Sequence, residues 1–76
     1  MRRPSRTRVV GYCYEGDIDV RAAEAILQRA TRDGVVTQFD SNKSCEFGMD
    51  CLWFNGQPGQ LLRDVRCQVE AHVRVV

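Results

Sequence analysis

Residues 19–34 constrain the fold most, because this stretch alone combines helical apolar spacing with both a start and a stop signal. Asp17 and Asp19 are candidates for the helix N-cap, and Gly34 is placed for a left-handed C-terminal cap. Two of the inward positions are alanine, which indicates close packing on another element. We therefore predict an amphipathic helix whose apolar face consists of Val20, Ala23, Ile26, Leu27 and Ala30.

Three other segments have the composition of short strands. Residues 7–14, 35–39 and 51–54 are rich in β-branched and aromatic side chains. Residues 40–48 are polar and irregular, so we predict an exposed loop there. Residues 55–59 are dense in Asn, Gly and Pro, which predicts a change of chain direction.

The C-terminal segment fits two periodicities. Leu61, Leu62, Val65 and Val69 share a helical face. From Val65 onward, however, apolar and polar residues alternate as in a half-buried strand. We predict one or two helical turns over residues 58–64, followed by a strand over 65–75.

These segments occur in the order β-α-β-β-(short α)-β. This order favours a single small α+β domain of the ferredoxin-like type, a two-layer sandwich with three to four strands. The alternative is one helix on a three- or four-stranded β-meander. We assign residues 9–76 to this domain and residues 1–8 to a flexible basic arm.

Charge is distributed unevenly along the 76 residues. The arm contains Arg2, Arg3, Arg6 and Arg8 and no acid, whereas the remainder has ten acidic residues against seven basic ones. No apolar run is long enough to span a membrane, and no export signal follows the arm. We therefore predict a cytoplasmic protein, or one in a host cytoplasm if a phage encodes it.

Four cysteines need an explanation in so short a chain. Structural zinc sites usually contain two close cysteine pairs, and only Cys45 and Cys51 lie near each other here. Without an export signal, a Cys45–Cys51 disulfide is not favoured. We predict that Cys13 and Cys67 are small buried side chains and that no cofactor is bound. A zinc-stapled domain using Cys13, Cys45, Cys51 and Cys67 remains the third functional hypothesis.

The sequence contains no catalytic motif. His72 is the single histidine and follows Cys67 by five residues, which places the two on opposite faces of a continuous strand. A cysteine–histidine pair is therefore disfavoured, and we predict a protein that is not an enzyme.

Protein binding is the leading hypothesis. A helix over one face of a sheet leaves the other face available, and aromatic residues commonly anchor protein interfaces. The acidic body favours a basic partner surface, and a homodimer is also compatible. We predict a regulator or inhibitor of a larger complex, of phage or mobile-element origin, that binds through Tyr12, Tyr14, Phe47, Trp53 and Phe54.

Binding of single-stranded nucleic acid is the alternative. In ferredoxin-like RNA-binding domains, aromatic residues on the two central strands stack on bases, and the basic arm could contact phosphates. Tyr12 and Tyr14 could equally belong to the core, with Val9 and Cys13 pointing outward. The residues for this alternative are Arg2, Arg3, Arg6, Arg8, Tyr12, Tyr14 and Trp53.

Overall fold

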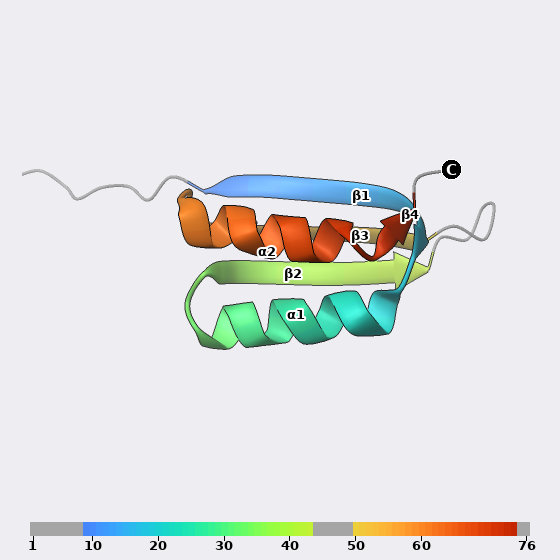
Figure 1. Ribbon diagram of the computed structural model, residues 1–76, viewed down its shortest axis with the longest axis horizontal. Helices are drawn as coiled ribbons and strands as arrows, with labels where there is room; N and C mark the ends of the chain where they lie inside the picture. Colours follow the sequence, from blue (N-terminus) through green and yellow to red (C-terminus); the bar gives the residue numbers. More distant parts are fainter. Residues whose placement is uncertain (1–8, 44–49, 75–76) are drawn as a thin grey trace, which may run out of the picture.

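The computed structural model describes residues 9–43 and 50–74 and shows an α+β domain with two helices and a four-stranded antiparallel sheet (Figure 1). The strand order β2-β3-β1-β4 and the β-α-β-β-α-β chain order confirm the ferredoxin-like prediction. The meander alternative is wrong because a second full helix is present. The elements are β1 (Val10–Ile18), α1 (Val20–Arg32), β2 (Val36–Lys43), β3 (Asp50–Gly56), α2 (Gln60–Glu70) and β4 (Val73–Arg74).

Helix α1 begins and ends at the residues that its caps dictate. The Asp19 side chain accepts a hydrogen bond from the Ala22 backbone N–H at 3.2 Å. At the other end, the N–H of Val35 donates to the carbonyl of Ala30 at 2.9 Å, and the N–H of Gly34 donates to Thr31 at 3.1 Å. This pair of bonds is a Schellman motif, and it confirms the predicted cap.

Gly34 holds this motif at a φ of +81°, which side chains with a Cβ adopt at a cost. We expect Gly34→Ala to lower the free energy of unfolding by about 1 kcal/mol, measured by urea denaturation. A Cβ at this position meets no atom within 4 Å, so the loss comes from the backbone alone. Gly34→Asn should lose less, because asparagine tolerates this conformation. Equal stability of all three proteins would contradict this assignment.

The core lies between the two helices and one face of the sheet. Leu27 of α1, Leu62 and Val69 of α2, and Leu52 and Phe54 of β3 are all essentially inaccessible to solvent. They belong to one cluster of buried residues, so both helices pack on the same face. No helix in the described part of the chain is both long and apolar enough to cross a membrane.

The C-terminal strand is present but its predicted start at residue 65 is wrong, because residues 60–70 form helix α2 and the described part of strand β4 is Val73–Arg74. Leu62, Val65 and Val69 follow helical spacing and are buried. Cys67 belongs to the alternating pattern but is exposed. Alternation and helical spacing share Val65 and Val69, and packing against the core selects the helix.

Strands β1 and β2 extend beyond their predicted ends. β1 continues to Ile18, and β2 runs through Asp40 to Lys43, which the sequence analysis assigned to a loop. Polar residues are tolerated in these extensions because one face of an antiparallel sheet can remain solvated.

Candidate protein-interaction face

The candidate site is the sheet face opposite the helices, which we call the open face. Side chains alternate between the two faces of a strand, so the residues paired in register with one another share a face. The buried residues Leu52 and Phe54 mark the helix-covered face, and their neighbours in β3 therefore mark the open face. The open face consists of Gly11, Cys13, Glu15, Asp17, Gln38, Asp40, Asn42, Cys51, Trp53, Asn55 and Arg74.

Trp53 lies at the centre of the open face. It pairs with Cys13 on β1 and with Asp40 on β2, so strands flank it on both sides. The side chain is 36% exposed, and within residues 9–43 and 50–74 it is the one aromatic side chain on this face. Partial burial fixes the indole on the sheet while leaving an apolar surface in contact with water.

One carboxylate lies beside this indole and two lie farther along the same face, because Asp40 pairs with Trp53 while Glu15 and Asp17 are two and four positions beyond Cys13 on β1. Glu15, Asp17 and Asp40 lie on the open face, and Arg74 opposes Asp17 on β4. Glu15 also accepts a hydrogen bond from the Cys51 thiol at 3.9 Å. The described part of the open face is therefore net negative, which favours a cationic partner and disfavours phosphate groups.

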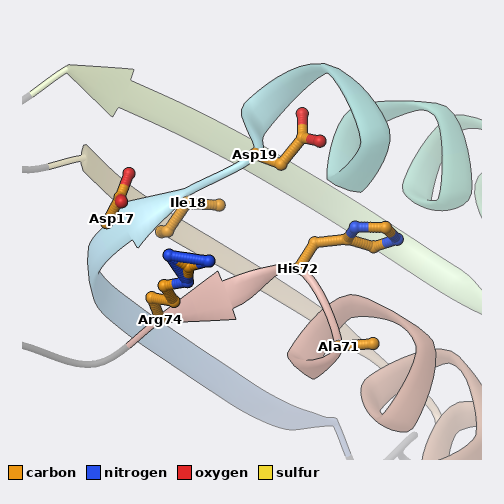
Figure 2. A pocket seen from close by; sticks show the side chains of 6 residues that line it. All are labelled: Asp17, Ile18, Asp19, Ala71, His72 and Arg74. Carbon is orange, nitrogen blue, oxygen red and sulfur yellow. The ribbon is translucent and has the colours of Figure 1, made fainter.

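A shallow pocket of about 310 Å³ lies at one end of the sheet (Figure 2). The Asp19 side chain in this pocket already caps α1, and its backbone N–H donates to the His72 carbonyl at 2.9 Å. In Figure 2 the side chains of Asp19 and His72 do not point at a common centre. We therefore assign the pocket a structural role at the end of the sheet. The residues that line it are Asp17, Ile18, Asp19, Ala71, His72 and Arg74.

The cysteines do not converge on a metal site in the part of the chain that the structure describes. Cys13 and Cys51 are on the open face, whereas Cys67 is on α2, which packs against the opposite face. Cys45 lies outside the described residues. The prediction that Cys13 and Cys67 are buried is wrong, since both are exposed. The alternation of β1 turns Cys13 outward, and the polar face of α2 carries Cys67.

Two of the predicted contact aromatics lie on the helix-covered face with Phe54. The ring centroids of Tyr12 and Tyr14 are 5.4 and 6.3 Å from that of Phe54. Phe54 is fully buried, so its predicted role in partner contact is wrong. The structure agrees with the second possibility raised from the sequence, in which both tyrosines pack against the core and Cys13 points outward. The cause is strand parity, because Tyr12 and Tyr14 share a face with buried Ile18.

The side chains of Tyr12 and Tyr14 both interact with residues of helix α2. The Tyr14 hydroxyl donates to Glu70 Oε2 at 2.8 Å, and the Arg66 guanidinium lies 5.2 Å from the centre of the Tyr12 ring. Burial, and then the hydrogen bond to Glu70, raise the pKa of Tyr14. Tyr14 therefore stays neutral and acts as a structural donor.

The remaining predicted site residues lie outside the described residues, namely Phe47 and the arginines Arg2, Arg3, Arg6 and Arg8. Of the aromatics predicted to stack on bases, only Trp53 is on the open face. Sequence reasoning also missed the polar residues of β2. Their signal was the alternation of Gln38, Asp40 and Asn42 with Phe39 and Ser41.

No known protein family and no solved structure matches this chain. The chain is similar to turripeptide OL55 from Iotyrris olangoensis, with 34% identity over 56 residues. The match covers 74% of this chain and 49% of the turripeptide, so the chain spans about half the length of this relative.

This similarity corrects the predicted location. The expectation of a cytoplasmic protein is contradicted by the similarity to a turripeptide. The predicted phage-encoded regulator finds no support in this similarity.

Proposed function

We propose that this chain is a secreted, toxin-like protein without enzymatic activity that acts by binding another protein through its open face. The observation that carries the proposal is the exposed indole of Trp53 among carboxylates, on a sheet face that neither helix covers. The similarity to a turripeptide supports the toxin-like character.

The chemistry of the open face specifies its partner. A rigid aromatic side chain is a typical interface anchor because it buries a large area at little entropic cost. Glu15, Asp17 and Asp40 of the open face would steer association toward a basic surface and make the association rate fall with salt. The partner is therefore a protein with an apolar slot bordered by Lys or Arg side chains.

The test is the substitution Trp53→Ala, measured against a partner captured on the immobilised chain. We expect at least about a 30-fold loss of affinity, corresponding to removal of an anchor worth about 2 kcal/mol. The matched control is Leu61→Ala, because Leu61 is an exposed apolar residue on α2, away from the open face.

The control should bind like the original protein, and thermal denaturation should show that both variants are folded. Equal affinities of the two variants would refute the open face as the binding surface. Affinity that does not fall between low and high salt would refute a basic partner.

A further inference from the structure

One edge of the sheet is open along most of strand β1. β1 spans Val10–Ile18, but its outer neighbour β4 pairs only with Asp17 and Ile18. Among the described residues, no strand pairs with β1 on this side over residues 10–16. Within residues 9–43 and 50–74, these seven positions of β1 therefore have no strand neighbour on this side.

The hydrogen bonds at the end of β1 show which backbone groups face this edge. The Asp19 N–H donates to the His72 carbonyl, and Asp17 is in register with Arg74. Backbone groups alternate between the two sides of a strand, so odd-numbered residues of β1 point toward the β4 side. The N–H and C=O groups of Gly11, Cys13 and Glu15 are therefore directed at the open edge.

In the part of the chain that the structure describes, a helix flanks the opposite edge of the sheet, whereas no element flanks β1 on its β4 side over residues 10–16. The outer strand β2 is flanked by α1, with a hydrogen bond from the Ser41 hydroxyl to Glu24. In Figure 1, β1 runs along the side of the molecule away from α1, and α2 does not extend beyond it on that side. Residues 10–16 contain no Lys or Pro and pair with β3 without a register shift, so Glu15 is the one charged side chain in this stretch that could oppose edge pairing.

We propose that this edge binds the same edge of a second copy of the chain. The two β1 strands run antiparallel about a two-fold axis, with Cys13 opposite its counterpart. Together they join two four-stranded sheets into one continuous sheet. The inference concerns the strand edge, so it stands whether or not the open face binds a partner protein.

The register around Cys13 is self-complementary. It places Gly11 opposite Glu15 of the second copy, so the carboxylate meets a glycine and no like charges oppose each other. It also places Tyr12 opposite Tyr14 on the helix-covered side, which makes two aromatic cross-strand pairs. All three outward-directed residues of each β1 edge gain backbone partners in this register.

This pairing has a chemical signature. Opposed residues in a hydrogen-bonded antiparallel pair have Cα atoms about 5.5 Å apart, which is within the range that a disulfide spans. Cys13 is exposed, so its thiol is accessible. With glutathione disulfide as oxidant, two Cys13 thiols form one S–S bond, and the oxidant takes up two electrons and two protons to give two glutathione molecules.

The first experiment measures mass in solution. Sedimentation of the full chain in the presence of a reductant should show a reversible dimer. Gly11→Pro should raise its dissociation constant roughly 30-fold, because it removes two edge N–H donors per dimer and no bond to β3. A chain that stays monomeric at high micromolar concentration, or a folded Gly11→Pro variant with unchanged affinity, would overturn the proposal.

The second experiment uses conservative variants and does not depend on Gly11→Pro folding. With glutathione disulfide, the Cys67→Ser protein should give a covalent dimer that mass spectrometry assigns to a Cys13–Cys13 link. Cys13→Ser should lose this product while circular dichroism stays unchanged. The same dimer yield in Cys13→Ser, or a monomer that pairs only with an added extended peptide, would count against a second copy as the occupant.

Discussion

Phe54→Ala is expected to lower the free energy of unfolding by about 3–5 kcal/mol. The Phe54 side chain is completely buried between the sheet and the helices, and both Tyr12 and Tyr14 pack against it. Its removal leaves a cavity in the core. A 76-residue domain has a small core and a low free energy of unfolding, so this loss is a large fraction of its stability. Urea denaturation at constant temperature measures the loss, and the variant should be largely unfolded in moderate denaturant.

Trp53→Ala is the matched control, because Trp53 is the next aromatic along the same strand but lies on the open face. Its stability loss should be only about 1 kcal/mol, as for a partly exposed cross-strand contact. The two substitutions should therefore have different effects: Phe54→Ala should mainly lower stability, and Trp53→Ala should mainly weaken binding. Similar losses of stability in the two variants would show that the assignment of faces in β3 is incorrect.

Gly56→Ala should be nearly as damaging, with an expected loss of about 3 kcal/mol. A Cβ at Gly56 would stand 2.2 Å from the carbonyl oxygen of Val35 and 3.0 Å from Leu62 Cδ1. The first of these atoms belongs to the backbone, so the connection between α1 and β2 must move. The loss therefore reports how closely that connection and helix α2 approach the end of β3.

Gly11→Ala is the control for Gly56→Ala. Gly11 lies on the neighbouring strand β1, and a Cβ there would have its nearest atoms at 3.8 Å, which is an ordinary contact. Its stability should change by no more than about 1 kcal/mol, and reduced freedom of the unfolded chain could make the change favourable. If thermal denaturation shows equal losses for the two alanine variants, the close approach at Gly56 is not real.

The two helices differ in how well the local sequence pattern predicts them. Helix α1 could be predicted because its caps and its apolar spacing agree and no strand pattern competes with them. Helix α2 carries valines that satisfy both a period of two and helical spacing, and Gly59 at its N-cap makes no side-chain bond. The choice there came from packing, because Leu62, Val65 and Val69 bury together against the sheet only as a helix.

The candidate site shows the same division. The sequence placed Trp53 in a strand and predicted a free sheet face, but it assigned Tyr12 and Tyr14 to that face and Phe54 to the contact surface. A strand's alternation defines two faces without saying which one the helices cover, and a shift of one residue exchanges them.

By itself, the sequence determined the helix at residues 19–34, the order of elements and the α+β class, because caps, turns and periodicity act between near neighbours. The tertiary structure alone decided the helical state of residues 60–70, the outward orientation of Trp53 and Cys13, and the edge of β1 that no other described strand covers over residues 10–16. Each of these depends on which distant segments pack together, and no local pattern contains that information.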